Sequence, residues 1–248
     1  ASFDAYMAQT DTWTSQAHPE LKGRPIAYFS MEFGLHETLP IYSGGLGVLA
    51  GDHLKESSDL GLPLIGVGFM YAQGYFSQRI SEDGWQEALN NMLDFNNLPA
   101  LPVLDDSGER LCVEVEFPDR IVSLGLWEIR VGRIPLYLLD SNLDPNTDSD
   151  KQLTARLYWS DLDRRVMQEL LLGVGGVRAL RSALARASGR KTVVLVSAGF
   201  PATDISGGRP DLGELGLLVG QEAARANSTI YALHVDTRRT ELGCASSA

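Results

Sequence analysis

A glycine-rich run at residues 43–47, Ser-Gly-Gly-Leu-Gly, is the part of the sequence best suited to hold an anion. Its three glycines can adopt positive φ angles, and they carry no Cβ that would block a ligand. A helix N-terminus presents N–H groups without intrahelical acceptors and the positive end of the helix dipole, which suits a phosphate. A helix is predicted here because apolar residues then recur near helical spacing, at Leu46, Leu49, Ala50, Leu54 and Leu60.

The same glycines have a second interpretation, which is tight packing of that helix against a neighbouring segment. The run lacks the Gly-Lys-Ser/Thr ending of a P-loop, and its spacing differs from Gly-x-Gly-x-x-Gly. On spacing alone, packing is therefore favoured over phosphate binding.

Two short apolar runs, residues 25–30 and 64–70, flank the loop and its helix, and both suit buried strands. Strand, loop, helix and strand in this order are typical of parallel strands joined by a right-handed crossover. The fold class predicted is therefore α/β, with a mainly parallel sheet over residues 20–180.

Residues 110–117, 121–131 and 134–139 are rich in Val, Ile, Leu and aromatic residues, with a turn expected between the last two. They predict an antiparallel β insertion. Further along, residues 171–187 read as a helical stretch despite their glycines. A helix is also predicted within residues 150–170 from apolar positions on one side, at Leu153, Leu157, Leu162, Val166 and Leu170.

The composition limits the classes of partner. The 248 residues carry 21 Lys and Arg against 32 Asp and Glu, a formal net charge of −11. This charge disfavours nucleic acid and anionic membranes as partners and leaves a neutral sugar polymer acceptable. No apolar run approaches 18 residues, so no membrane span is expected. Cys112 and Cys244 are expected to be free thiols in a reducing, cytoplasmic compartment.

The sequence around the loop resembles a known family through many short segments in the same order over about 180 residues. The segments are 28–37, 39–47, 58–68, 73–76, 83–87, 113–118, 135–140, 153–158, 168–169 and 172–180. Together they closely resemble the N-terminal part of the shorter bacterial α-glucan (glycogen, starch or maltodextrin) phosphorylases.

That resemblance implies the N-terminal lobe of a glycosyltransferase B-type, Rossmann-like fold. It also implies glucosyl transfer from a 1,4-α-glucan end to inorganic phosphate, giving glucose 1-phosphate, with pyridoxal phosphate as cofactor. The implied partners are the α-glucan and phosphate. The family holds its cofactor through a Schiff-base lysine in the C-terminal half, and no context here matches it at Lys22, Lys55, Lys151 or Lys191. We therefore expect no covalent cofactor and no phosphorolysis by this chain alone.

The resemblance also assigns roles to single residues. The backbone N–H groups of Gly44, Gly45 and Leu46 are expected to face the phosphates of substrate and cofactor. Glu32 matches a carboxylate near the active-site cleft, and its alternative role is that of a structural hydrogen-bond partner. Asp161 matches an acidic residue on a loop beside the sugar site, although Leu162 follows it where larger family members carry a polar residue. The alternative for Asp161 is an ordinary exposed carboxylate.

Other residues have weaker claims on chemistry. Aromatic rings can stack on sugars, but a core or interface role is favoured for the set Tyr71, Tyr75, Phe76 and Trp85. His53 and Glu56 stand one helical turn apart, yet without a third ligand a solvated helix face is favoured over a metal site.

The phosphorylase resemblance ends near residue 180. The tail, 191–248, resembles the C-terminal half of a von Willebrand factor A-type domain, with strands at 192–197 and 229–235 around a helix at 211–226. It lacks the Asp-x-Ser-x-Ser segment of the metal-binding members, so no metal is expected. Residues 181–190 are expected to form a pliable junction between the 1–180 and 191–248 domains. A partial βαβ tail of this kind is the alternative basis for function, as a non-catalytic module with a protein partner. The junction is interpreted as a natural fusion, a truncation or an assembly error, and the third interpretation of function is a truncated or misjoined product without independent function.

Overall fold

The computed structural model describes residues 2–75, 77–89, 92–157, 159, 161–184, 191–197 and 228–234. The chain divides into two units, Ala1–Ala187 and Ser188–Ala248, named here the N-terminal unit and the tail unit.

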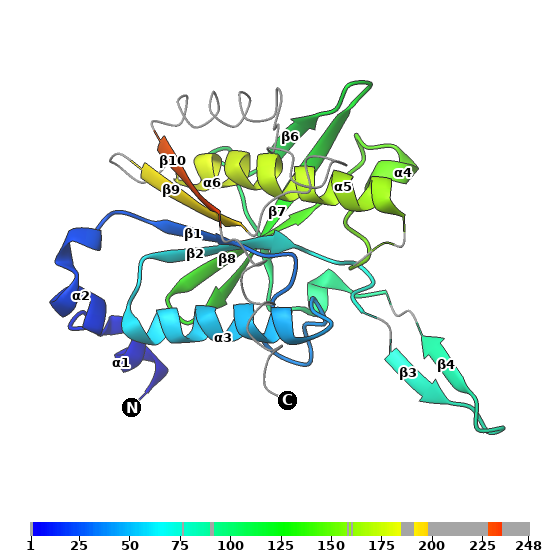
Figure 1. Cartoon of the computed structure of the whole chain (residues 1–248), viewed down its shortest axis with the longest axis horizontal. Helices are drawn as coiled ribbons and strands as arrows, with labels where there is room; N and C mark the ends of the chain where they lie inside the picture. The colour runs from blue at the N-terminus through cyan, green and yellow to red at the C-terminus, as the bar shows by residue number, and fades with distance from the viewer. Residues whose placement is uncertain are drawn as a thin grey trace, which may run out of the picture. The chain divides into compact units, whose positions relative to one another are not determined.

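A six-stranded mixed sheet forms the centre of the N-terminal unit (Figure 1). Its order is β1-β2-β8-β7-β5, with β6 pairing with β7 as well. The pairs β1–β2 and β2–β8 are parallel, while β7 is antiparallel to β8, β5 and β6. The bounds are β1 Ile26–Phe29, β2 Leu64–Phe69, β5 Leu101–Pro102, β6 Cys112–Glu116, β7 Ile121–Val131 and β8 Ile134–Asp140.

The antiparallel strands and the turn between the last two of them were predicted, and the structure has both. Gly132, with a φ of 58°, lies in the turn that joins β7 to β8. Their place in the fold differs from the expected insertion. β8 is a central strand that pairs directly with β2, with Gly66 opposite Leu136, so the sheet is mixed rather than mainly parallel. Burial explains why β8 pairs with β2. Every residue of β2 is buried, so a strand that pairs with it must itself be apolar, as β8 is.

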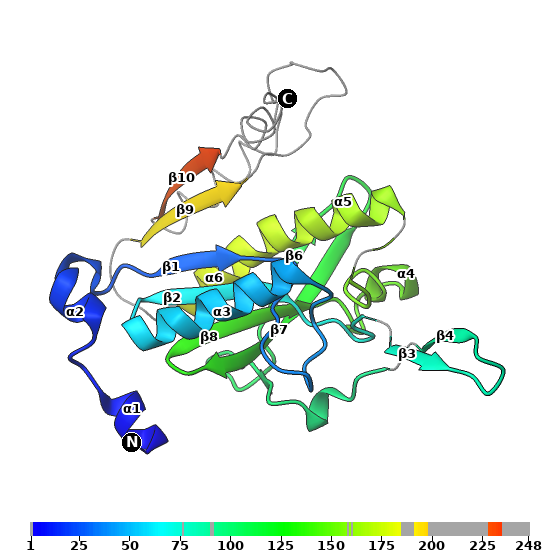
Figure 2. The same ribbon diagram turned by 60° about the horizontal axis from the view of Figure 1, so that its bottom comes forward.

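Helices cover both faces of this sheet, with α3 on one face and α5 and α6 on the other (Figures 1 and 2). The helix α3, Gly45–Leu60, begins at the predicted loop and ends at Gly61, whose φ is 71°. It packs on the sheet through Ala50 and Leu54, both fully buried. This confirms the predicted order of strand, loop, helix and strand.

The predicted helix within residues 150–170 is wrong in its extent. The structure has two shorter helices, α4 Asp148–Lys151 and α5 Leu162–Leu170, with turns around the buried Leu153 and Leu157 between them. Asp161 caps α5, so the helix starts afresh there. The apolar spacing misled because Leu162 and Val166 are exposed rather than part of a buried stripe. The expected second helical stretch is present as η3, a π-helical turn at Leu171–Gly175, followed by α6, Gly176–Leu184.

Short helices open the chain: α1 Phe3–Ala8, α2 Trp13–Ala17 and the 3-10 turn η1 Pro19–Leu21. They are fastened to the C-terminal end of α3. The Tyr6 hydroxyl lies 2.6 Å from Ser58 Oγ and donates to Asp59 Oδ1 at 2.7 Å. The Arg133 guanidinium lies over the Tyr6 ring, 3.9 Å from its centroid, and donates to the Tyr6 carbonyl.

A separate hairpin, β3 Ser77–Ile80 and β4 Gln86–Leu89, extends away from the sheet (Figures 1 and 2). It is followed by the 3-10 turn η2, Phe95–Asn97. An exposed ion pair between Arg79 and Glu87 joins the two strands.

The tail unit contains the parallel pair β9 Lys191–Ser197 and β10 Ser228–His234, with Lys191 opposite Ser228. Both strands were predicted, at 192–197 and 229–235, and each lies within one residue of its predicted bounds. The helix expected at 211–226 lies outside the described residues, and the partial βαβ unit therefore stays a prediction. The expected junction is described only up to Leu184, where its first residues belong to α6.

Candidate functional site

The carboxyl ends of three parallel strands meet at one edge of the sheet, and α3 begins there. Glu32 follows β1, Tyr71 follows β2 and Ser141 follows β8. Crevices at the carboxyl ends of parallel strands are the usual binding position in open α/β sheets. The Tyr71 hydroxyl donates to the Met31 carbonyl at 2.8 Å, which ties the segment after β1 to the segment after β2.

The N-terminus of α3 has the properties of an anion site. Gly44 is its N-cap residue, and no side chain caps this terminus among the described residues. The first intrahelical bond runs from the Val48 N–H to the Gly44 carbonyl at 3.2 Å. The N–H groups of Gly45, Leu46 and Gly47 precede this first helical donor and have no acceptor within the helix, and the helix dipole adds partial positive charge at the same place.

The glycines of this region separate into two kinds. A Cβ on Gly51 would lie 2.7 Å from the Gly34 carbonyl carbon, and closer still to its oxygen. A Cβ on Gly47 would collide with Tyr42 Cβ and lie 3.0 Å from Glu32 Oε2. These two positions satisfy the packing interpretation. At Gly44 and Gly45, in contrast, a Cβ would meet nothing within 4 Å, so packing does not account for those two glycines.

Glu32 lies behind the loop and holds it. Its carboxylate accepts the Ser43 N–H at 2.8 Å and the Gly44 N–H at 3.4 Å, and the side chain is 2% exposed. Glu32 therefore acts as a hydrogen-bond partner of the loop, which was one of its two predicted roles. Because the Gly44 N–H already has an acceptor and Gly47 is buried, Gly45 and Leu46 are the exposed residues of this terminus whose N–H groups have no acceptor within the helix.

Aromatic side chains from β1 and the segment after it lie beneath α3. The Tyr28 and His53 rings are in contact with their centroids 4.8 Å apart and their planes tilted by 58°, and Tyr28 meets Phe33 edge to face. Burial raises the pKa of the Tyr28 hydroxyl, so it stays protonated at neutral pH. The His53 ring is therefore in contact with the Tyr28 ring. Among the described residues no cluster of three or more His, Cys, Asp or Glu side chains could hold a metal, so the His53–Glu56 pair stands without a third ligand.

Asp161 is an exposed helix-capping residue in this structure. Its carboxylate accepts the Asp163 N–H at 3.0 Å, and it lies 3.7 Å from the Arg164 guanidinium. The Arg164 guanidinium also lies over the Trp159 ring, 4.3 Å from its centroid. The predicted sugar contact of Asp161 stays a prediction.

The aromatic residues offered for sugar stacking separate as well. Tyr71 is fully buried and belongs to the core, as the favoured interpretation had it. Trp85 is 76% exposed at the tip of the β3–β4 hairpin, and Tyr75 is 45% exposed. Phe76 lies outside the described residues.

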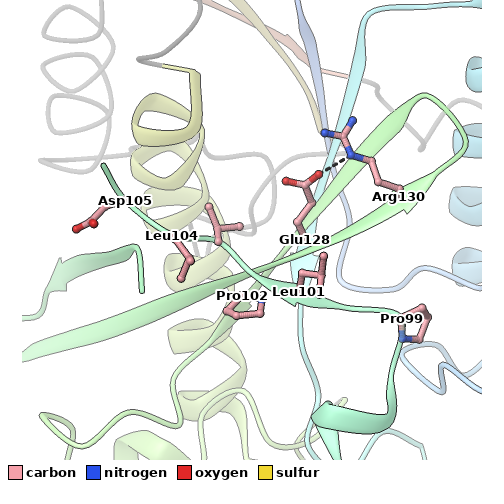
Figure 3. Close-up of a pocket in the computed structure, with 8 residues that line it drawn as sticks. Pro99, Leu101, Pro102, Leu104, Asp105, Glu128 and Arg130 are labelled. Atoms are coloured by element: carbon pink, nitrogen blue, oxygen red, sulfur yellow. Dashed lines mark ion pairs between the residues drawn. The ribbon is translucent and has the colours of Figure 1, made fainter. Parts of the chain in front are cut away.

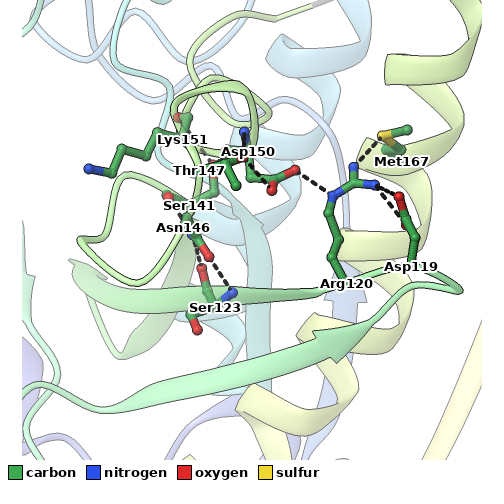
Figure 4. A network of polar contacts seen from close by, with 9 residues as sticks. All are labelled: Asp119, Arg120, Ser123, Ser141, Asn146, Thr147, Asp150, Lys151 and Met167. Atoms are coloured by element: carbon green, nitrogen blue, oxygen red, sulfur yellow. Dashed lines mark hydrogen bonds and ion pairs between the residues drawn. The ribbon is translucent and has the colours of Figure 1, made fainter.

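A buried polar network fixes the loop after β8, and sequence reasoning did not find it (Figure 4). Asn146 accepts the Ser123 N–H and donates to the Ser123 and Ser141 carbonyls, at 2.7–2.8 Å. Asp150, 2% exposed, accepts the Arg120 Nε–H at 2.9 Å and the Thr147 hydroxyl at 2.7 Å. The hydrogen bond to Asp150 raises the pKa of the Arg120 guanidinium, so the guanidinium stays protonated.

A second cluster at the end of β8 was also missed. Asp140, 3% exposed, accepts from Arg110 Nη2 at 3.0 Å and from Trp127 Nε1 at 3.1 Å. The Arg110 guanidinium stands 4.7 Å from the Trp127 ring centroid. An acidic residue closing an apolar strand was the signal that could have indicated this partner set.

A shallow pocket of about 590 Å³ lies elsewhere, along the edge strand β5 (Figure 3). Leu101 and Pro102 line it together with the ion pair of Glu128 and Arg130. A hydrogen bond from Ser107 holds the pKa of the nearby Asp105 carboxyl below its usual range. This pocket contains none of the predicted site residues.

Known proteins match the N-terminal segment that contains this loop. Glycogen phosphorylase of Aquifex aeolicus is 53% identical over 154 residues, which are 62% of this chain and 22% of that protein. Maltodextrin phosphorylase of Thermococcus litoralis is 44% identical over 179 residues, 72% of this chain and 21% of that protein. Glycogen phosphorylase of Mycobacterium tuberculosis is 50% identical over 158 residues, 63% of this chain and 18% of that protein.

The chain thus spans about a fifth of the length of these relatives. A family model described as a protein of unknown function (DUF3417) matches residues 1–39. The comparisons give no support to the von Willebrand factor A-type tail or to a function without catalysis built on it. In the described part of the chain, no helix is both long and apolar enough to cross a membrane.

Proposed function

We propose that the N-terminal unit is the phosphate-binding part of an α-glucan phosphorylase, in which a glucosyl unit passes from a 1,4-α-glucan to inorganic phosphate. The observation that carries this proposal is the uncapped start of α3, with open space at Gly44 and Gly45, inside a segment 44–53% identical to glycogen and maltodextrin phosphorylases. The partners proposed are phosphate and the glucan.

The chemistry of the loop is electrostatic. The N–H groups of Gly45 and Leu46 would donate to phosphate oxygens, and the dipole of the 16-residue helix would add to the attraction. Such donors need no reorganisation when charge develops on the anion. The loop therefore binds and orients phosphate, and we assign it no bond-making step.

The cofactor of the phosphorylases, pyridoxal phosphate, fits this chain only through its phosphate group. When bound, it supplies a phosphate that exchanges a proton with the substrate phosphate. The same open helix start suits that group, because its donors are backbone N–H groups. Two of the described lysines are poorly placed for a Schiff base at this start: Lys55 lies ten residues into α3, about 15 Å along its axis, and Lys151 is paired with Asp144. We therefore propose that this chain does not hold the cofactor covalently.

Binding of inorganic phosphate tests the site. The variant Gly45→Pro removes one N–H at the first helical position, where proline fits a helix, and Gly45→Ala keeps that N–H. We expect Gly45→Pro to weaken phosphate binding about tenfold or more, since hydrogen bonds to a charged group are worth about 1.5–3 kcal/mol. Gly45→Ala should bind as the parent does. Calorimetric titration of the full chain measures both, and equal affinity of the two variants would contradict the assignment.

Turnover tests the limit of the proposal. With maltodextrin, phosphate and added cofactor, the full chain is expected to release no glucose 1-phosphate and to retain no cofactor absorbance after borohydride reduction. Backbone donors alone supply neither a cationic clamp nor an opposing wall that excludes water. A stoichiometric covalent cofactor, or phosphate-dependent release of glucose 1-phosphate, would overturn this expectation.

A further inference from the structure

Glu32 places a full negative charge in the wall of a site proposed for an anion. Its carboxylate is 2% exposed, and it lies within one loop of the donors at the start of α3. A buried carboxylate at such a position repels phosphate and is costly to desolvate, so its presence calls for a compensating role.

The contacts of Glu32 indicate that role. Oε2 accepts the Ser43 N–H at 2.8 Å and the Gly44 N–H at 3.4 Å, the two N–H groups immediately before α3. The Ser43 hydroxyl adds a longer contact at 3.5 Å to each oxygen. The next two residues, Gly45 and Leu46, are exposed at the start of the helix.

The segment that carries Glu32 is itself fixed to the same loop. The Phe33 N–H donates to the Ile41 carbonyl at 3.2 Å, and the Gly34 N–H donates to the Gly47 carbonyl at 2.7 Å. Glu32 Oε2 and Cβ fill the space where a Cβ on Gly47 would lie, at 3.0 and 3.1 Å. The Glu32 side chain is therefore packed against the loop that it bonds.

We infer that Glu32 is a positioning residue, whose inward bonds to Ser43 and Gly44 set the loop so that the start of α3 faces its anion. The identity of that anion rests on the proposed function. The role requires an acceptor oxygen at the reach of a glutamate side chain, and it does not require the charge.

Two variants separate reach from charge. Glu32→Gln keeps an acceptor oxygen at the same distance without the charge, while Glu32→Asp keeps the charge and shortens the reach by one carbon–carbon bond, about 1.5 Å. Amide hydrogen exchange of Ser43 and Gly44, followed by NMR in the full chain without phosphate, reports the two bonds directly. We expect exchange about tenfold faster or more in Glu32→Asp and close to the parent rate in Glu32→Gln.

Phosphate affinity provides a readout that mere destabilisation would not move. Glu32→Asp is expected to bind inorganic phosphate about tenfold more weakly, and Glu32→Gln at least as tightly as the parent, since a repelling charge is gone. The matched control is Asp150→Asn, which also alters a carboxylate that is 2% exposed. It should lower the unfolding temperature while the Ser43 and Gly44 exchange rates and the phosphate affinity stay unchanged.

The outcomes are distinguishable from a failure of the proposed function. A parent chain that binds no phosphate contradicts the proposed function, whereas the exchange rates still decide the role of Glu32. Unchanged exchange at Ser43 and Gly44 in a folded Glu32→Asp chain would overturn the inference. Equal acceleration in Asp150→Asn would overturn it too, because the effect would then reflect general loosening.

Discussion

Replacing Gly51 by alanine is expected to destabilise the N-terminal unit by about 3 kcal/mol or more. The added Cβ would lie 2.7 Å from the Gly34 carbonyl carbon and closer to its oxygen, and both are backbone atoms that no rotamer change can move away. Helix propensity alone would favour alanine by about 1 kcal/mol, so the steric term must dominate. Thermal unfolding should show a fall of about 6 °C or more, since 1 kcal/mol shifts a unit of this size by about 2–4 °C.

Gly45→Ala is the matched control, because it adds the same methyl group to the same helix in open space. Its unfolding temperature should stay within about 2 °C of the parent. A Gly51→Ala chain that unfolds at the parent temperature would show that α3 and the Gly34 segment are not in close contact, and the packing interpretation of these glycines would fail.

Asp150→Ala is expected to cost about 2–4 kcal/mol, by leaving the buried side of Arg120 without its partner. Asp150 accepts from Arg120 Nε and from the Thr147 hydroxyl, and its backbone N–H is the one that Thr147 caps at the start of α4. The change therefore breaks an ion pair and loosens a helix cap together. Urea unfolding of the full chain, followed through the N-terminal unit, measures the loss.

Asp119→Ala removes the other carboxylate on the same arginine and serves as the control. The Asp119 side chain is 72% exposed and pairs with Arg120 Nη1 at 2.9 Å. An exposed ion pair contributes less than about 1 kcal/mol, so its loss should be small. Equal losses in Asp119→Ala and Asp150→Ala would show that burial does not set the strength of this network.

The sequence was sufficient for elements whose pattern is local. The helix after the loop, the strands around it and the turn at Gly132 all follow from apolar spacing and turn residues, and the structure has each of them. Local pattern could not show that β8 would lie beside β2, because that pairing depends on which apolar strand buries the sheet. It also misread residues 150–170, where Asp161 starts a new helix.

The candidate site was predictable in kind and not in detail. Spacing could not separate Gly47 and Gly51, which pack, from Gly44 and Gly45, which face open space, since the difference lies in Tyr42 and Gly34 across the loop. Burial of Glu32 was expected to require a partner, but its partners are backbone N–H groups, which leave no trace in residue types. The hydrogen-bonded residues around Asp150 could not be predicted from the sequence either, because Arg120 lies 30 residues before Asp150 in the chain.

The central position of β8 has a consequence for synthesis on the ribosome. β2 ends at Phe69, and its partner β8 begins only at Ile134. Translation at about 5–20 residues per second therefore leaves roughly 3–13 s in which β1, α3 and β2 have emerged but the apolar edge of β2 has no neighbour. Arg133, which fastens Tyr6 to the end of α3, arrives in the same late step. Aggregation through this unpaired edge competes with folding during the interval. Expression conditions that slow the association of incomplete chains are therefore expected to raise the yield of folded protein.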